Sequence, residues 1–420
     1  MEALKISGGN RLKGSISISG SKNATLPILT ATLLAEGKCR IYGVPCLQDV
    51  RTMLKILVGL GAHVEWDKDC VMVDSSGVKS FTAPYELVKK MRASICLLGP
   101  LLARFGRARV SLPGGCVIGD RPVDIHLKGL GRLGVKFKIL EGNLEGKVER
   151  LRGSPVFLGG AFGSSVLATA NLMMAASLAQ GETVIEFAAC EPELIDLANF
   201  LNRMGARISG AGNHLVRIKG VKKLRPADYK VMPDRIEAGT YLLAGAITQG
   251  EIEVNNCIPE HLFALTDRLI DAGVEVKKGK ESLKVRLRKK LRGVDVVTLP
   301  YPGFPTDLQA QFMSLMALAD GVSVITEKVF PERFMHAAEL KRLGADITIK
   351  DGTAIVRGKE RLTGTRVMAS DLRASAALVL AGLVASGETV VSRIYHLDRG
   401  YQDMEGKLNS VGAEIVRIQE

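Results

Sequence analysis

The loop from Leu112 to Asp124 contains the residues best suited to chemistry. It reads Leu-Pro-Gly-Gly-Cys-Val-Ile-Gly-Asp-Arg-Pro-Val-Asp, and its thiol is Cys116. The Pro-Gly-Gly run and Gly119 predict irregular backbone on both sides of this thiol. Arg121 favours the reactive thiolate, because a nearby guanidinium stabilises negative charge, whereas Asp120 opposes it. From these residues alone, a reactive cysteine and a buried structural one are equally well supported.

The other cysteines and the histidines form no recognisable chemical motif. Seven cysteines are an odd number, and no two of them have the CxxC spacing of a redox or zinc site. The six histidines show neither HxxxH nor HExxH spacing, so we expect no metal site. The remaining cysteines are interpreted as small buried side chains: Cys39, Cys46, Cys70, Cys96, Cys190 and Cys257.

Six predicted helix starts hold a second group of candidates. Each start carries Ser, Thr, Asp or Asn, which cap helices, and four of the six also carry a cation. Helix N-termini bind anions through free N–H groups and the helix dipole, so equivalent starts brought together would form an anion site. Any one of these cations is more often structural, and some will pair with carboxylates such as Asp234 or Asp371. Their recurrence favours a binding role for the set, which is Lys22, Arg92, Arg235 and Arg373.

Two series of glycines divide the chain into repeats. In the first series, each glycine ends an apolar helical stretch and precedes a β-rich run. This series is Gly37, Gly106, Gly181, Gly250, Gly321 and Gly387. The second series lies in helix-to-strand turns and is Gly61, Gly134, Gly205, Gly273, Gly344 and Gly412. Its successive members are 73, 71, 68, 71 and 68 residues apart, which predicts six units of about 70 residues, each helix, strand, helix, strand, strand.

The sixth repeat ends one strand early, at Glu420, and the start of the chain resembles the missing strand. Leu4–Gly14 matches Ala354–Gly364 in the spacing of its Gly, Arg and Leu residues. We therefore predict that residues 1–21 complete the sixth unit. Residues 22–232 would then form the first domain, and residues 1–21 plus 233–420 the second. The predicted fold class is α/β, with three repeated units in each domain.

The composition is typical of a globular protein, with 46% hydrophobic and 24% charged residues. The N-terminus does not resemble a signal peptide and no apolar run has the length of a membrane span, so we expect a cytoplasmic protein. The net charge of +13 favours anionic ligands. An aromatic content of 5% argues against stacking on nucleic-acid bases, and the basic run Arg286–Arg292 is better interpreted as a solvated surface turn.

Eight segments of the chain resemble the UDP-N-acetylglucosamine enolpyruvyl transferases (1-carboxyvinyltransferases) of the EPSP synthase superfamily. In family order they are Ser19–Ala24, Val88–Ser94, the Cys116 loop to Asp124, Pro233–Glu237, Phe304–Asp307, Arg333–His336, Asp371–Ser375 and Asp398–Tyr401. Members catalyse the first committed step of peptidoglycan synthesis. The resemblance implies two inside-out α/β barrel domains of three repeats each, and a transferase that uses phosphoenolpyruvate as its donor.

The resemblance also implies a role for each matching residue. Cys116 would be the general acid, could form an adduct with phosphoenolpyruvate, and would be the residue that fosfomycin alkylates. Asp307 would be the base for the sugar's 3-hydroxyl, and its structural alternative is an N-cap of a helix from Leu308. Phosphoenolpyruvate would be held by Lys22, Asn23, Arg121 and Arg399, of which Lys22 and Arg399 would also be catalytic. UDP-N-acetylglucosamine would be held by Asn23, Arg92, Arg121, Pro122, Val123, Asp124, Ile125, Ser165, Val166, Asp307 and Val329.

The implied reaction is an addition followed by an elimination. The hydroxyl adds to the protonated enol to give a tetrahedral ketal, and phosphate then leaves while nearby cations stabilise the developing charge. We expect this reaction to need neither a metal nor an organic cofactor. The expected partners are the two small-molecule substrates, without nucleic acid, a membrane or an obligate protein partner.

The chain departs from the family pattern at two places, and the first of them concerns the nucleotide pocket. Gly163-Ser164-Ser165-Val166-Leu167 replaces the usual Lys or Pro and the Ser-Val-Gly that follows it, and Gln48 stands where some members have lysine. One alternative function is that of the sister enzyme that makes 5-enolpyruvylshikimate-3-phosphate, although the Lys22-Asn23 pair favours the nucleotide sugar. The other is a basic repeat protein that binds nucleic acid, which would explain the charge but not the matched loop.

Overall fold

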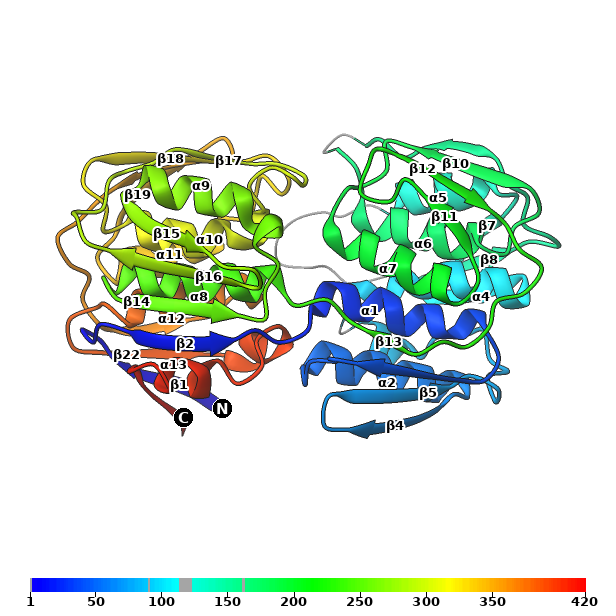
Figure 1. Ribbon diagram of the computed structural model, residues 1–420, viewed down its shortest axis with the longest axis horizontal. Helices are drawn as coiled ribbons and strands as arrows, with labels where there is room; N and C mark the ends of the chain where they lie inside the picture. The colour runs from blue at the N-terminus through cyan, green and yellow to red at the C-terminus, as the bar shows by residue number, and fades with distance from the viewer. Residues whose placement is uncertain (1, 90, 113–122, 161–162) are drawn as a thin grey trace. The chain divides into compact units, whose positions relative to one another are not determined.

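The computed structural model describes residues 2–89, 91–112, 123–160 and 163–420. These residues form two compact units, which we call the terminal unit and the middle unit (Figure 1). The terminal unit combines the chain up to Ser19 with Pro233–Glu420, and the middle unit runs from Gly20 to Met232. Within the described ranges, no helix has both the length and the apolar character that crossing a bilayer requires.

The helices of each unit are short and of two kinds, α-helices and 3-10 helices (η) of three to six residues. In the middle unit they are α1 (Lys22–Ala31), η1 (Thr32–Leu34), α2 (Gln48–Leu60), α3 (Tyr85–Val88), η2 (Arg92–Leu97), α4 (Leu98–Phe105), α5 (Asp124–Arg132), α6 (Val166–Ala176) and α7 (Pro192–Arg203). In the terminal unit they are α8 (Arg235–Ile247), η3 (Pro259–Leu262), α9 (Phe263–Asp271), α10 (Thr306–Met316), α11 (Met335–Arg342), α12 (Leu372–Gly382), η4 (Ile394–Arg399) and α13 (Met404–Asn409).

Three helices form the centre of the terminal unit because they are apolar on nearly every side. Every residue of α8 is buried, as are Leu308–Met316 of α10 and Arg373–Gly382 of α12. A helix without a polar face has to be enclosed by other elements. The three helices accordingly pack against one another inside the unit (Figure 1). Their counterparts in the middle unit are α1, α4 and α6.

The described strands form three sheets in each unit. In the middle unit their orders are β13 (Tyr229–Lys230), β3 (Lys38–Tyr42), β5 (Cys70–Asp74), β4 (His63–Asp67); β6 (Arg107–Ser111), β8 (Asn143–Lys147), β7 (Lys136–Leu140); and β11 (Arg207–Ser209), β12 (Leu215–Lys219), β10 (Glu182–Glu186), β9 (Pro155–Phe157). In the terminal unit they are β15 (Val274–Lys278), β16 (Ser282–Leu287), β14 (Glu251–Asn255), β2 (Lys13–Ser17); β17 (Val296–Thr298), β18 (Val322–Glu327), β20 (Thr353–Arg357), β19 (Asp346–Lys350); and β21 (Arg366–Met368), β22 (Glu388–Ser392), β1 (Glu2–Ser7), β23 (Glu414–Gln419).

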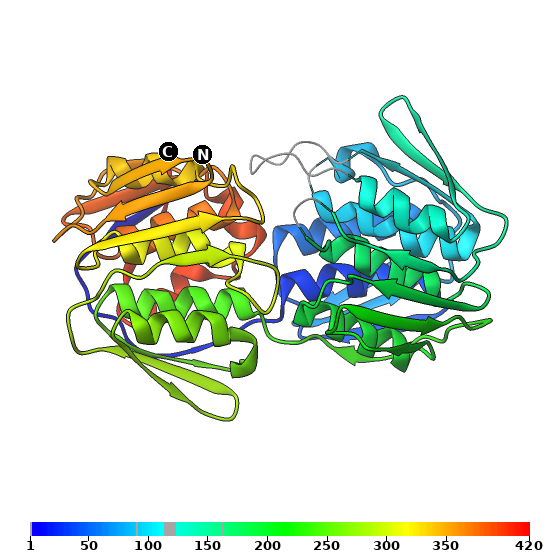
Figure 2. The ribbon, with the colours of Figure 1, turned by 90° about the horizontal axis from the view of Figure 1, so that it is seen from above.

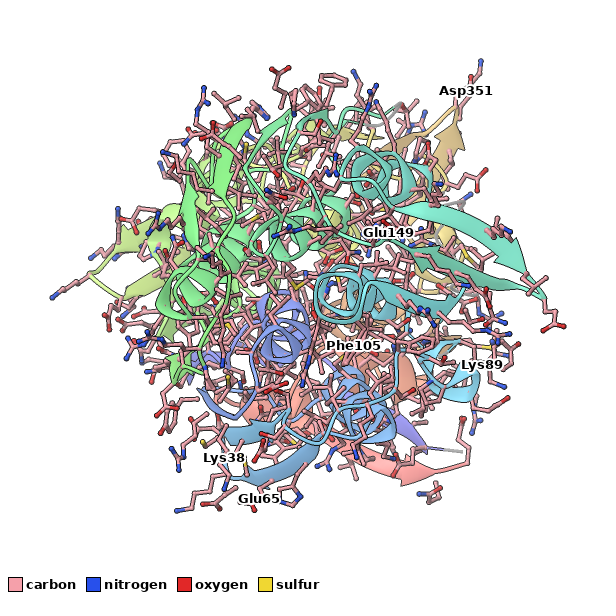
Figure 3. All side chains as sticks on the ribbon, turned by 90° about the vertical axis from the view of Figure 1, so that its right-hand side faces the viewer. Lys38, Glu65, Lys89, Phe105, Glu149 and Asp351 are labelled. Atoms are coloured by element: carbon pink, nitrogen blue, oxygen red, sulfur yellow. The ribbon has the colours of Figure 1, made fainter. Side chains whose placement is uncertain are left out.

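The sheets cover the central helices and turn one face to solvent. In β14, Ile252 and Val254 are buried, whereas the alternate residues Glu251, Glu253 and Asn255 are partly exposed. This alternation is expected for a sheet with one packed face. Figure 2 shows the strands on the outside of each unit, and Figure 3 shows Lys38 and Glu65 on the outer strands β3 and β4. The predicted inside-out α/β fold is therefore confirmed.

Five of the six described sheets also have a short leading strand, parallel to its neighbour, that the sequence pattern did not predict. In the fifth repeat, for example, β17 pairs in parallel with β18, while β20 is antiparallel to both β18 and β19. The leading strands β9, β17 and β21 have three residues each, too few to show an alternating pattern.

The first two strands of the chain belong to two different sheets. β1 lies between β22 and β23 and is antiparallel to both, in the sheet of the sixth repeat. β2 is parallel to β14 and serves as the leading strand of the fourth repeat. Only β1 therefore completes the sixth repeat, whereas the whole of residues 1–21 was expected to do so.

The chain passes between the two units at two places. β2 is followed by α1 of the middle unit, and β13 is followed by α8 of the terminal unit. The two passing segments are hydrogen bonded to each other within each unit: Ser21 N donates to Met232 O at 2.7 Å, and Asp234 N donates to Ser19 O at 2.9 Å.

One backbone position takes a left-handed conformation in four of the repeats. It is the sixth residue after each helix-ending glycine, immediately after the strand that follows the central helix, and there φ lies between 54° and 71°. The four residues are Gly43, Phe187, Asn256 and Arg393. In the fifth repeat the same position is Glu327, which remains in strand β18. The turn that follows β18 must therefore be made in another way.

Candidate active site

Asp307 lies in the first turn of α10 between two guanidinium groups. Its Oδ1 accepts a hydrogen bond from Arg333 Nη1 at 2.8 Å, and its Oδ2 accepts one from Arg373 Nη2 at 2.8 Å. The arginine side chains are 7% and 2% exposed, whereas that of Asp307 is 26% exposed. Two charge-assisted hydrogen bonds favour the ionised carboxylate, which is the form that can accept a proton. The alternative that Asp307 caps a helix is wrong, because α10 begins at Thr306 after Pro305.

Arg373 orients Asp307 from inside the terminal unit. It follows the N-cap of α12, Asp371, whose carboxylate accepts from Arg373 N at 2.8 Å and from Ala374 N at 3.2 Å. Its guanidinium lies 5.4 Å from the centre of the Tyr401 ring. Burial opposes the positive charge, but Asp307, Tyr401 and Asp234 outweigh this effect and raise the pKa of Arg373. This predicted binding cation is thus engaged with a predicted catalytic carboxylate.

Arg235 lies at the start of α8 in a different environment. The N-cap Asp234 accepts from Ile236 N at 2.8 Å and from Glu237 N at 3.0 Å. The guanidinium of Arg235 lies 5.4 Å from the centre of the Tyr301 ring, where the two line a pocket of about 50 Å³. So small a pocket holds a water molecule or two rather than a substrate.

Val329 follows β18 and is held through its backbone. Its N–H donates to Glu327 Oε1 at 2.9 Å, as does that of Phe330. The other carboxylate oxygen, Oε2, accepts from the Thr306 hydroxyl at 2.8 Å. Thr306 also accepts from Arg333 Nη1 at 3.1 Å. Val329 and Asp307 therefore belong to one hydrogen-bonded network.

Arg399 is the last residue of η4 and is half-buried. Two residues later, the Tyr401 hydroxyl lies 2.9 Å from Thr240 Oγ1 and accepts from Gln311 Nε2 at 3.1 Å. Thr240 lies on α8 and Gln311 on α10. The two hydrogen bonds therefore attach the segment that contains Arg399 and Tyr401 to both of these helices. Burial and the neighbouring charge of Arg399 lower the pKa of His396, which keeps that ring neutral.

Lys22 is the first residue of α1 in the middle unit. The N-cap Ser21 accepts from Ala24 N at 3.3 Å. Lys22 Nζ lies 3.6 Å from Asp49 Oδ2, and the two side chains are only 11% and 6% exposed. Asp49 therefore fixes the position of the ammonium group beside Asn23.

Arg92 begins η2 and is electrostatically coupled to the buried His126 on α5. Asn171 Oδ1 accepts from Gly99 N at 2.7 Å, so its amide nitrogen faces His126 Nδ1, 3.0 Å away. His126 Nδ1 is thus an acceptor, and Nε2 carries the proton. Burial, and to a lesser degree Arg92, lower the pKa of His126 to about 3.

Acidification should weaken the middle unit through His126. The unfolded histidine takes up a proton below a pKa of about 6.5, but the folded one does so only near 3, so this contribution to stability is lost as the pH falls between these values. From pH 7 to pH 5 the loss should be about 2 kcal/mol. Thermal unfolding of the wild type and of His126→Gln, which retains an acceptor for Asn171, should show a smaller pH effect in the variant. Identical pH profiles would contradict the assignment.

The remaining predicted residues of the middle unit lie at the starts of α5 and α6. Ser165 is the N-cap of α6 and accepts from Ala168 N at 3.3 Å, and Val166 follows it. Asp124 is exposed at the start of α5, with Val123 and Ile125 half-buried beside it. The predicted Cys116, Arg121 and Pro122 lie outside the described residues.

The described cysteines differ in exposure. Cys39, Cys96, Cys190 and Cys257 are buried as predicted, whereas Cys70 is partly exposed. The prediction is wrong for Cys46, which is exposed because it lies in the loop between β3 and α2, where its Sγ accepts from Arg51 Nη2 at 2.9 Å.

Among the described residues, no group of three or more His, Cys, Asp or Glu side chains is placed to hold a metal ion.

Nearly the whole chain matches one known family. A family model described as EPSP synthase (3-phosphoshikimate 1-carboxyvinyltransferase) matches residues 6–408. The chain belongs to the EPSP synthase family. The predicted resemblance and the predicted enzyme type, an enolpyruvyl transferase, are therefore confirmed.

Relatives within the EPSP synthase family match along their full length. The UDP-N-acetylglucosamine 1-carboxyvinyltransferase of Geotalea uraniireducens is 54% identical over 420 residues, covering 100% of both chains. The enzyme of the same name from Coxiella burnetii is 53% identical, covering 100% of this chain and 96% of its own. The solved enolpyruvyl transferase NikO from Streptomyces tendae has a TM-score of 0.91 at 28% identity, covering 100% and 99%. An EPSP synthase from Acinetobacter baumannii, at a TM-score of 0.77 and 18% identity, shares the fold.

One departure of this EPSP synthase family member has a backbone cause. Gly160 and Gly163 exchange two hydrogen bonds, of 3.0 and 3.2 Å, and Gly163 has φ of +95°. A side chain such as lysine is strained in that conformation. Leu167, in the same segment, packs against the core of the middle unit. Gln48, the second departure, is the first residue of α2. The basic run Arg286–Arg292 is solvated as predicted but is not a turn throughout, because Arg286 and Leu287 end strand β16. Arg286 and Lys290 are exposed and pair with acidic side chains at 3.2 and 3.1 Å.

Sequence reasoning missed three residues that hold Asp307 and Val329. Arg333 lies in a segment used for the family resemblance, but it was given no role. Thr306 is the threonine of the Pro-Thr-Asp motif, where a capping role was the obvious expectation. Glu327 ends a strand without any local signal.

Proposed function

We propose that this protein transfers the enolpyruvyl group of phosphoenolpyruvate to the 3-hydroxyl of UDP-N-acetylglucosamine, with release of phosphate. The observation that carries the proposal is the partly exposed carboxylate of Asp307, held ionised between two buried guanidinium groups. A positioned carboxylate of this kind is suited to take the proton of a hydroxyl as that hydroxyl attacks. The acceptor is the one in the names of relatives that are 53% and 54% identical over the whole chain.

The proposed reaction proceeds in two steps. Asp307 removes the proton from the sugar hydroxyl, the oxygen forms a bond with C2 of phosphoenolpyruvate, and Cys116 protonates C3. The product of this step is a tetrahedral ketal. In the second step a proton leaves C3, the bond from C2 to the phosphate oxygen breaks, and the new enol ether is released with phosphate. The first step moves the hydroxyl proton to Asp307 and a proton from Cys116 to C3. The second step returns the C3 proton to Cys116 and passes the proton on Asp307 to the departing phosphate. Both residues end as they began, and neither step needs an oxidant or reductant.

The cations of the site would bind the donor and stabilise developing charge. Lys22, whose position Asp49 fixes, would bind the phosphate together with Arg121 and Arg399. Asn23 would contact both substrates. The acceptor's binding group would be Arg92, Arg121, Pro122, Val123, Asp124, Ile125, Ser165, Val166, Asp307 and Val329.

Phosphate release with two alternative acceptors tests the proposal. The purified protein is mixed with phosphoenolpyruvate and either UDP-N-acetylglucosamine or shikimate-3-phosphate, and free phosphate is followed over time. We expect release with the nucleotide sugar alone. Release only with the shikimate ester would assign the activity named in the family model, and release with neither acceptor would contradict both assignments.

A further inference from the structure

We propose that Glu327 is a positioning residue that holds Asp307 and the Val329 backbone in one fixed arrangement. The inference deepens the proposed function, because it assumes that Asp307 acts as the base and that Val329 contacts the acceptor. Glu327 itself is 2% exposed and touches neither substrate in this assignment. It acts through two branches of hydrogen bonds, one from each carboxylate oxygen.

The first branch organises the turn after β18. Glu327 Oε1 accepts from the backbone N–H of Val329 and of Phe330, both at 2.9 Å, and from the hydroxyl of Thr298 at 2.6 Å. Thr298 in turn accepts from Lys328 N at 3.0 Å. Three consecutive amide groups are therefore fixed, directly or through Thr298, by one buried carboxylate.

The second branch leads to the candidate base. Glu327 Oε2 accepts from the hydroxyl of Thr306 at 2.8 Å. With its proton committed to Glu327, Thr306 Oγ1 can accept from Arg333 Nη1, 3.1 Å away. The same Nη1 donates to Asp307 Oδ1 at 2.8 Å. Glu327 thus sets the direction of the Thr306 hydroxyl, and this hydroxyl helps to hold the guanidinium that orients Asp307.

Comparison with four of the other repeats, the second excepted, shows what the carboxylate of the fifth repeat adds. At the equivalent position, four repeats use a left-handed residue to turn the chain. The fifth repeat instead extends its strand to Glu327 and makes the turn with side-chain hydrogen bonds to the amides. A turn that only had to reverse the chain could have kept the left-handed form. Glu327 adds a connection to Thr306 and Arg333 that a left-handed backbone turn does not supply.

The network requires a carboxylate at this position rather than any polar group. All four partners of Glu327 donate to it: two amides and two hydroxyls. A glutamine has a single acceptor oxygen, and its NH2 group would face either the amides or the Thr306 hydroxyl. If the glutamine oxygen accepts from the amides of Val329 and Phe330, its NH2 group faces Thr306 and donates to the hydroxyl oxygen. The Thr306 hydroxyl proton must then point elsewhere, and the hydrogen bond that Thr306 accepts from Arg333 is disrupted.

Four variants separate the two branches. Glu327→Gln should lower kcat and raise KM for UDP-N-acetylglucosamine. Thr306→Val removes the second branch alone, so kcat should fall between about tenfold and a hundredfold while this KM changes little. Thr306→Ser restores the hydroxyl and should recover most of kcat. The control is Glu186→Gln, an exposed carboxylate at the end of β10 in the third repeat, which should behave as the wild type.

The measurements are steady-state phosphate release and thermal unfolding of the same protein samples. A lower unfolding temperature with unchanged kcat and KM in Glu327→Gln would overturn the proposal, since it would show a purely structural role. Equal losses in Thr306→Ser and Thr306→Val would also overturn it. If the wild type releases phosphate only with shikimate-3-phosphate, the proposed acceptor is wrong, but the same kcat comparison with that acceptor still tests the branch to Asp307.

Discussion

Asp307→Asn should lower kcat by about a thousandfold, within the range that a positioned general base contributes. Asparagine keeps the shape of the side chain but cannot take the hydroxyl proton. Its single oxygen can accept from one guanidinium, while its NH2 group is turned towards the other, Arg333 or Arg373. Steady-state phosphate release gives kcat, and titration calorimetry with UDP-N-acetylglucosamine should show that the acceptor still binds.

Asp346→Asn is the matched control for this variant. Asp346 also lies between two cations of the terminal unit, with Arg357 at 3.7 Å and Lys359 at 3.4 Å, but it is 37% exposed on the outer face of a sheet. Exposed ion pairs contribute little, so its kcat should equal that of the wild type. A kcat for Asp307→Asn within tenfold of the wild type would show that another group removes the proton.

Arg373→Met should destabilise the terminal unit by about 3–5 kcal/mol, the usual effect of breaking a buried ion pair from one side. The Arg373 side chain is 2% exposed, and its loss removes one charge-assisted hydrogen bond to Asp307 while that from Arg333 remains. Methionine fills most of the volume, so the effect comes from the missing charge rather than from a cavity. Thermal unfolding should show a lower transition temperature, and kcat should fall because Asp307 loses a partner that fixes its position.

A surface arginine of the same unit separates this effect from a general loss of charge. Arg366 pairs with Glu420 at 3.2 Å and its side chain is 75% exposed, so Arg366→Met should unfold at the wild-type temperature. The double variant Asp307→Asn with Arg373→Met should be less destabilised than the sum of the two single variants, because the groups act as a pair. Full additivity would indicate that Arg373 stabilises the unit without help from Asp307.

The repeat architecture was predictable because glycine leaves a local signal. A helix that ends at a left-handed residue favours glycine whatever the rest of the fold does, so Gly61 and Gly106, the left-handed C-caps of α2 and α4, mark helix ends in the sequence itself. Gly181, Gly321 and Gly387 are also left-handed but lie in the turns a few residues beyond the ends of α6, α10 and α12. The leading strands left no such signal, since three residues cannot establish a period. The place of β2 beside β14 was equally hidden, because its partner lies more than 230 residues further along the chain.

The candidate site was predictable only where its residues leave a local signal in the sequence. Asp307 and the helix-start cations could be located from local patterns and from the family resemblance. The partners of Asp307 could not, because Arg333 and Arg373 are 26 and 66 residues away and meet it only in the folded unit. A sequence pattern also cannot distinguish a buried glutamate such as Glu327 from an exposed one such as Glu186, although each lies near the end of an equivalent strand.

The position of β1 between β22 and β23 has a consequence for synthesis of the chain. A ribosome makes β1 and β2 first, yet the strand partners of β1 appear only with the last 33 residues, from Glu388 to Glu420. The middle unit has all of its described strands once Met232 has been made, since β13 then completes the sheet of β3. Domains generally fold as they emerge. The middle unit can therefore fold while translation continues, and the terminal unit must keep β1 unpaired until the strands β22 and β23 have been made.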